Sequence, residues 1–171
     1  MAKKEKKLTI YYTPEVFSKI TRLILAFDKE VGWNMVVESC TNGYRITDIF
    51  VYPQKQSGAY LAVDEAKYAM WKATIPPEAD ANLFGQGHSH VMMGVCPSSR
   101  DAEQQKDEVL QKGHGFYFFQ IWNKKLEVNS FLYDIDNNVM YDADDIRLVI
   151  EEDDFIRESK EILANLEGVK E

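Results

Sequence analysis

The chain has 171 residues, of which 45% are hydrophobic and 28% charged, and its formal net charge at pH 7 is −8. This length and composition are typical of one compact globular domain. The negative charge and the lack of a basic stripe argue against a nucleic-acid partner, because binding to phosphates needs clustered Lys and Arg side chains. The sequence has no apolar stretch of about 18 residues, so no membrane span is expected.

The lysine-rich start, residues 1–7, is expected to be a flexible, solvated tail in front of a single domain over residues 8–171 that ends in a helix. This start lacks the apolar segment and the small-residue cleavage site of a secretory signal. The two cysteines, Cys40 and Cys96, are far apart in the sequence and form no CxxC pair. No disulfide is therefore expected, and a reducing cytoplasm is favoured.

Apolar periodicity, caps and turn residues predict a mixed α/β domain with helices and strands interspersed along the chain. Asn42-Gly43 is expected to turn the first hairpin. The expected helices cover 14–28 with Thr13 as N-cap, 64–72, 98–112 or 99–112, and Asp154–Glu167. The expected strands cover 33–39, 44–52, 59–63, 83–88, Phe116–Trp122, 126–133 and 139–142, while Ile146–Ile150 is ambiguous.

Two of the three histidines, His88 and His90, lie two residues apart at the end of the strand predicted over 83–88. Residues i and i+2 of a strand point to the same face, so both imidazoles can bind one ion. Asp101 falls in the first turn of the next predicted helix, from which its carboxylate can reach that ion. Zinc accepts His nitrogen and Asp oxygen, and its catalytic sites keep one coordination position open for water. An isolated His-x-His pair is more often a surface or packing pair, so the interpretation depends on the wider pattern.

His88-x-His90, followed by seven residues, Ser98, two residues and Asp101, resembles the signature of the JAMM metalloproteases, also called MPN+ or Mov34/JAB proteins. The order and type of the predicted elements from about residue 13 to residue 131 are also similar to those of the family. The resemblance implies an α/β (α+β) domain with the cytidine-deaminase-like MPN/JAB fold, in which helices flank a mixed β-sheet. It also implies that His88, His90 and Asp101 bind Zn²⁺.

The resemblance assigns catalytic roles to two more residues. Glu30, which follows the first predicted helix, matches the family's catalytic glutamate, which takes a proton from a zinc-activated water. Ser98 matches the serine whose hydroxyl stabilises the oxyanion. Glu38 is the competing base, but it lies at the hairpin end of its strand. Ser98 or Ser99 can instead serve only as the N-cap of the helix that follows.

Several residues near the motif depart from the family or play no part in it. Val91 stands where the family often has Pro, and the segment 32–37 replaces a small, Gly-rich pattern. Met93-Gly94-Val95 resembles stand-alone phage and bacterial members, so a phage or prophage origin is the corresponding expectation. His114 lies beside two glycines after a predicted helix stop and is not expected to bind the metal. Cys96 is expected to be a packing residue of the loop, with access to the metal as the less favoured alternative.

The resemblance thus implies a zinc-dependent peptidase or isopeptidase in the cytoplasm, or in the host cytoplasm if the chain is phage-encoded. Its substrate would be a protein or peptide, with the tail of a ubiquitin-like protein as one candidate. One alternative is a catalytically silent MPN-fold interaction module, although such members typically lose metal ligands. Another is a metal-dependent phosphoesterase or nuclease, which the net charge and the lack of a second carboxylate-rich metal site disfavour.

Overall fold

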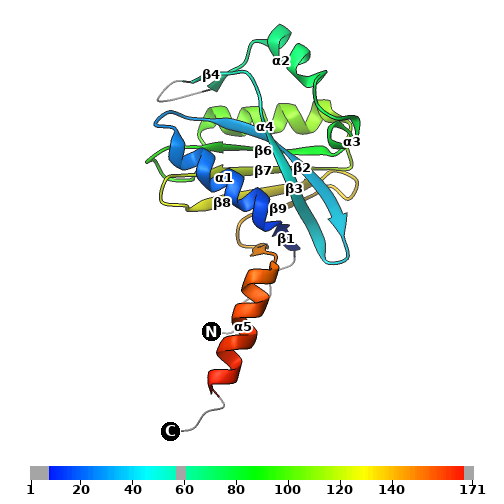
Figure 1. Cartoon of the computed structure of the whole chain (residues 1–171). Coiled ribbons are helices and arrows are strands. Elements are labelled where there is room, and N and C mark those ends of the chain that lie inside the picture. The colour runs from blue at the N-terminus through cyan, green and yellow to red at the C-terminus, as the bar shows by residue number, and fades with distance from the viewer. Residues whose placement is uncertain (1–7, 57–60, 168–171) are drawn as a thin grey trace.

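The structure is a computed structural model that describes residues 8–56 and 61–167 (Figure 1). The tail predicted for residues 1–7 lies outside the described residues, as does part of the strand predicted over 59–63. The elements in chain order are β1 (Leu8–Tyr12), α1 (Pro14–Ala26), β2 (Gly32–Cys40), β3 (Gly43–Val51), β4 (Lys55–Gln56), β5 (Leu61–Ala62), α2 (Glu65–Lys72), α3 (Pro77–Asp80), β6 (Leu83–Ser89), α4 (Ser99–Lys112), β7 (Phe116–Trp122), β8 (Val128–Asp134), β9 (Val139–Tyr141), β10 (Ile146–Ile150) and α5 (Asp154–Glu167).

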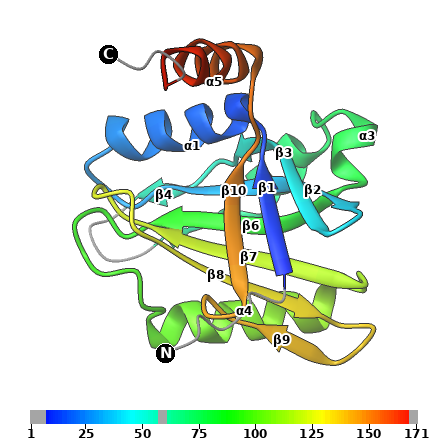
Figure 2. The ribbon, with the colours of Figure 1, turned by 90° about the horizontal axis from the view of Figure 1, so that it is seen from below.

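Eight of the described strands form one mixed sheet in the order β10-β1-β3-β2-β6-β7-β8-β9. β1 pairs in parallel with both β10 and β3, and β6 pairs in parallel with β7, while the other neighbours are antiparallel. The sheet curls until β1 and β10 lie across β6, β7 and β8, so it is nearly closed (Figure 2). The predicted class, a mixed α/β domain with a mixed sheet and helices beside it, is confirmed.

The main core lies inside this curl and is closed by α1. Thr13 caps α1 by accepting a hydrogen bond from the Val16 backbone N–H at 3.3 Å, as predicted. Val16, Ile20 and Ile24 recur at helical spacing and are buried against the sheet. α4 lies on the opposite side of the sheet from α1, next to β7 (Figure 2). The sheet therefore buries one face against α1 and presents part of the other face to α4.

Two local predictions are corrected by the pairing of strands that are distant in sequence. The turn of the first hairpin is formed by Thr41 and Asn42, whereas Gly43 already belongs to β3. Gly43 has a φ of 151°, and a Cβ there would lie 1.9 Å from the Thr9 carbonyl oxygen, so only glycine fits beside β1. The ambiguous segment Ile146–Ile150 is strand β10, because β1 pairs with it along its whole length.

Helix α5 projects away from the rest of the molecule (Figure 1). Its large apolar side chains are exposed, with Phe155 at 72%, Ile162 at 63% and Leu163 at 60%. None of the helices in the described part of the chain has the length and apolarity that a membrane crossing requires.

Gly87 generates a prediction about packing directly beside His88. A Cβ at Gly87 would lie 2.4 Å from the Nε1 and Cε2 atoms of Trp33, whose side chain is fully buried. We expect Gly87→Ala to lower the free energy of unfolding by about 1–3 kcal/mol, because the rigid indole has no room to move. Gly94→Ala is the matched control, since a Cβ there meets no atom within 4 Å. Equal unfolding free energies for the two variants in denaturant titrations would contradict this packing argument.

Candidate metal centre

β6 places the two histidines on one face of the sheet. Along β6, the residues from Leu83 to Ser89 alternate between fully and partly buried, and His88 belongs to the partly buried set. His88 lies opposite Gly32 of β2 on one side and Ile121 of β7 on the other. His90 follows the last residue of β6, but its backbone N–H still donates to the Trp122 carbonyl oxygen at 2.7 Å. The strand geometry thus continues through His90, and both imidazoles lie on the same face, as predicted.

Asp101 is the third residue of α4 and is oriented by a capping box with Ser98. The Ser98 backbone N–H donates to Asp101 Oδ2 at 2.7 Å, and the Asp101 backbone N–H donates to Ser98 Oγ at 3.2 Å. The Ser98 hydroxyl also donates to Asp101 Oδ2 at 2.7 Å. These reciprocal bonds hold the Asp101 carboxylate in the first turn of the helix.

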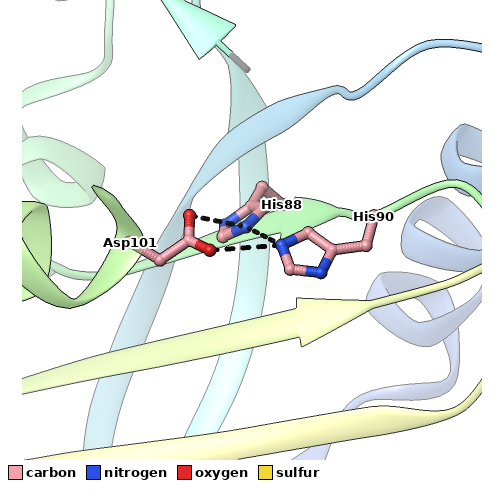
Figure 3. A group of neighbouring side chains, drawn as sticks. All are labelled: His88, His90 and Asp101. Carbon is pink, nitrogen blue, oxygen red and sulfur yellow. Dashed lines mark hydrogen bonds and ion pairs between the residues drawn. The ribbon is translucent and has the colours of Figure 1, made fainter. Parts of the chain in front are cut away.

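Donor atoms of His88, His90 and Asp101 converge from the two elements (Figure 3). The Nε2 atoms of His88 and His90 are 3.0 Å apart, and they lie 3.2 and 3.3 Å from Asp101 Oδ1 and Oδ2, respectively. One ligand atom from each residue lies within 4.8 Å of the other two. Two imidazole nitrogens and one carboxylate oxygen form a donor set that fits zinc.

The second ring nitrogen of His90 fixes the tautomer of this imidazole. His90 Nδ1 lies 2.8 Å from the Gly94 carbonyl oxygen. A carbonyl oxygen can only accept, so Nδ1 carries the proton and Nε2 keeps its lone pair for a metal. Partners of this kind orient metal-binding histidines in proteins.

The surroundings of Asp101 and His90 shift the pKa values of these two side chains in opposite directions. Burial alone would raise the pKa of Asp101, but hydrogen bonds with His88, His90 and Ser98 outweigh it and hold this pKa far below its ordinary value. The same hydrogen bond with Asp101 raises the pKa of His90, and burial opposes it. Asp101 is therefore ionised at neutral pH.

Glu30 lies in the same cleft as the three possible ligands. The cleft has a volume of about 290 Å³, and Glu30, His88, His90 and Asp101 all line it. Glu30 is only 5% exposed, and this burial raises its pKa, with the two imidazoles acting in the opposite direction. The competing base, Glu38, is exposed near the hairpin end of β2, opposite Arg45 of β3, and does not line the cleft.

The other residues that the sequence singled out take different places. Ser98 is the N-cap of α4 and also lines the cleft. Ser99 is the first residue of α4. Cys96 is exposed and lines the cleft, so its prediction as a packing residue is wrong. His114 packs edge-on against Phe84 at a ring distance of 4.6 Å and is not part of the metal-binding group.

The sequence predictions missed the walls of the cleft. Gln86 lines it two residues before His88, and Gln104 lines it three residues after Asp101. Strand and helix periodicity could have found both, because such neighbours share a face with the ligands. Tyr52 and Phe119 also line the cleft, but sheet pairing brings them there and no local pattern marks them.

Comparisons of the sequence with known proteins assign no family to this chain. No protein-family profile matches the sequence, and no curated protein matches it.

Val91, the position at which the family pattern often has Pro, has a φ of 55°. The proline ring fixes φ near −65°, so proline cannot adopt this conformation. We expect Val91→Pro to lower the free energy of unfolding by more than about 1 kcal/mol and to abolish metal binding. Val91→Asn is the control, because Asn tolerates positive φ, and it should retain both properties. Denaturant titration and metal analysis test this, and a stable, metal-binding Val91→Pro protein would contradict it.

Metal binding should depend on pH, because only neutral imidazoles bind metal. The hydrogen bond with Asp101 raises the pKa of His90 above its ordinary 6.5, so protons compete for Nε2 already above that pH. We expect zinc affinity to fall steadily as the pH is lowered from about 8 to about 5.5. Calorimetric zinc titrations at several pH values measure this, with His114→Ala as a variant that should keep the same profile. An affinity that stays constant over this range would argue against histidine ligands.

Proposed function

We propose that the chain is a JAMM-type zinc peptidase or isopeptidase that hydrolyses an amide bond in a protein or peptide substrate. The observation that carries the proposal is the convergence of His88, His90 and Asp101 in a cleft that also contains the buried Glu30. The spacing of the motif supports the same family, and with it the cytidine-deaminase-like MPN/JAB fold and a cytoplasmic location. A phage origin belongs to the same proposal.

The three ligands would be His88 Nε2, His90 Nε2 and the Asp101 carboxylate. Zinc bound there would supply the Lewis acidity that activates a water molecule and polarises the scissile carbonyl group. Glu30 accepts the proton of the attacking water and passes it to the leaving amine. Burial raises the pKa of Glu30, which favours this exchange because a carboxyl group that titrates closer to neutral pH can both take and release a proton.

Ser98 serves the reaction through its hydroxyl group. In the resting site this hydroxyl donates to Asp101 Oδ2 and so orients the ligand. Because Ser98 also lines the cleft, its hydroxyl can turn toward the oxyanion that forms when the carbonyl is attacked. Removing a donor of this type from other hydrolases lowers kcat by about 10²–10³-fold.

The lining of the cleft favours an amide substrate over a phosphate ester. Arg100 is the single Lys or Arg side chain among the described residues that line it. Enzymes that act on phosphoryl substrates often use two metals, and nucleic-acid binding needs clustered cationic side chains. The side chains of Gln86 and Gln104 are neutral and can both donate to and accept from a peptide backbone. An extended protein tail, such as that of a ubiquitin-like protein, is the substrate that we propose.

The test of catalysis is Glu30→Gln. This variant should bind one zinc ion per chain like the wild type but cleave peptide substrates at least about 100-fold more slowly, because it has lost the base. Glu38→Gln, the same change at the exposed rival position, should cleave like the wild type. Digestion of a peptide library and metal analysis measure both properties. Unchanged cleavage by Glu30→Gln would remove Glu30 from the mechanism.

The double substitution His88→Ala/His90→Ala separates the enzyme from a silent interaction module of the same fold. The enzyme should lose both zinc and cleavage in this variant. A wild-type protein that binds no zinc and cleaves no peptide would favour the silent module, and metal-dependent cutting of DNA would favour a nuclease.

A further inference from the structure

Gln54 lies just beyond the end of β3, and its side chain bonds to both backbone groups of Gly32. The Gly32 N–H donates to Gln54 Oε1 at 2.7 Å, and Gln54 Nε2 donates to the Gly32 carbonyl oxygen at 2.9 Å. Gln54 Nε2 also donates to the Tyr52 carbonyl oxygen at 2.9 Å. A primary amide has the same donor and acceptor as a peptide group, so this side chain takes the place of a strand neighbour.

β3 ends one residue before the position opposite Gly32, so its ladder does not include these bonds. The ladder between β2 and β3 ends where Trp33 lies opposite Val51. In this register Tyr52 would lie opposite Gly32, but β3 ends at Val51, and the Gln54 amide bonds to Gly32 instead. An unpaired backbone group at a buried position such as Gly32 costs free energy. The Gln54 side chain supplies the missing partners and extends the ladder to Gly32.

On its other edge, the backbone at Val31 and Gly32 is bonded to β6, the strand that carries His88. The Ser89 N–H donates to the Val31 carbonyl oxygen at 2.9 Å, and Gly32 lies opposite His88. The backbone at Val31 and Gly32 is therefore fixed from both sides. Glu30 is the adjacent residue and lies between the end of α1 and the start of β2, outside any helix or strand. The direction of its side chain consequently depends on how firmly Gly32 is held.

We propose that Gln54 is a positioning residue, whose side-chain amide clamps the Gly32 backbone and thereby holds the Glu30 carboxylate toward His88 and His90. The inference rests on the proposed function, in which Glu30 is the base. Gln54 itself touches no reacting atom in this scheme and acts only through Glu30.

The clamp is tested without any substrate by amide hydrogen exchange at Gly32. Gln54→Met keeps the length of the side chain and removes its hydrogen bonds. We expect the Gly32 amide to exchange about tenfold faster in this variant, because a lost hydrogen bond makes local opening easier. Gln111→Met is the matched control, since Gln111 is exposed on α4, and Gly32 should exchange there as in the wild type. Equal exchange at Gly32 in Gln54→Met and wild type would overturn the inference.

The effect on Glu30 is tested by kinetics on the zinc-loaded protein. Gln54→Met should lower kcat by at least about tenfold and leave KM unchanged, because proton transfer needs a well-placed base while substrate binding does not. In the Glu30→Gln background, Gln54→Met should have almost no further effect, since the residue it orients is already disabled. Multiplicative losses in the double variant, or unchanged kcat in Gln54→Met, would overturn the positioning role.

The outcomes separate this inference from the proposed function. If the wild type cleaves no amide substrate but the Gly32 amide responds to Gln54→Met, the proposed function fails and the clamp is supported. If the wild type cleaves and Gln54→Met is indistinguishable from it in exchange and in kcat, the inference fails and the proposed function stands.

Discussion

The site depends on the position of β6 in the middle of the sheet, with β2 on one edge and β7 on the other. Bonds along both edges leave β6 no freedom to slide or rotate, so the direction of His88 is set by backbone pairing. The same pairing brings Glu30, which precedes β2, to the ligand end of β6. Asp101 comes from a helix, so sheet pairing cannot orient it. The capping box with Ser98 holds its carboxylate in place instead. A rigid sheet and a capped helix end thus meet at one cleft.

Two carboxyl groups in this cleft have opposite electrostatic settings. Asp101 accepts a hydrogen bond from Ser98 and lies beside both imidazoles, and these contacts hold its pKa far below the ordinary value despite burial. Glu30 is buried, and this burial raises its pKa. Environments that push the pKa values of neighbouring acids apart assign one to a permanent negative charge and the other to proton transfer. This division fits a ligand and a base, and it follows from the polar contacts of Asp101 and from the burial of Glu30.

Predictions from the sequence were correct where neighbouring residues determine the structure. They failed where the structure depends on pairing between strands that are distant in the sequence. The spacing of His88, His90 and Asp101 could be interpreted because strand and helix periodicity place such residues on one face. The hairpin turn was shifted by one residue because Gly43 is required by its contact with β1, which no local pattern reveals. Gln54 was missed for the same reason, since its partner Gly32 lies 22 positions earlier in the chain.

Physical reasoning from the sequence could not by itself choose between Glu30 and Glu38. Glu30 precedes the strand and Glu38 lies within it near the hairpin, and the choice of Glu30 rested on the family order. In the structure the two lie toward opposite ends of β2: Glu30 is buried in the cleft, whereas Glu38 is exposed near the hairpin. The register between β2 and β6 places the start of β2 beside His88. Glu30, which precedes β2, therefore lies near the ligands, and Glu38, near the other end of β2, does not.

The loop between the ligands shows how a departure from the family pattern can be accommodated. Positive φ at a β-branched residue is unfavourable, so Val91 must be held in place by its surroundings. Three hydrogen bonds tie this loop to β8 and to the connection before it: the Lys124 N–H to the Val91 carbonyl oxygen at 2.7 Å, Asn123 Nδ2 to the Met93 carbonyl oxygen at 3.1 Å, and Asn129 Nδ2 to the Val95 carbonyl oxygen at 3.2 Å. The turn at Val91 also lets the chain fold back so that the Gly94 carbonyl oxygen reaches His90 Nδ1. A rigid proline is thus not needed to orient His90, because contacts with the neighbouring strand and its connection hold the loop instead.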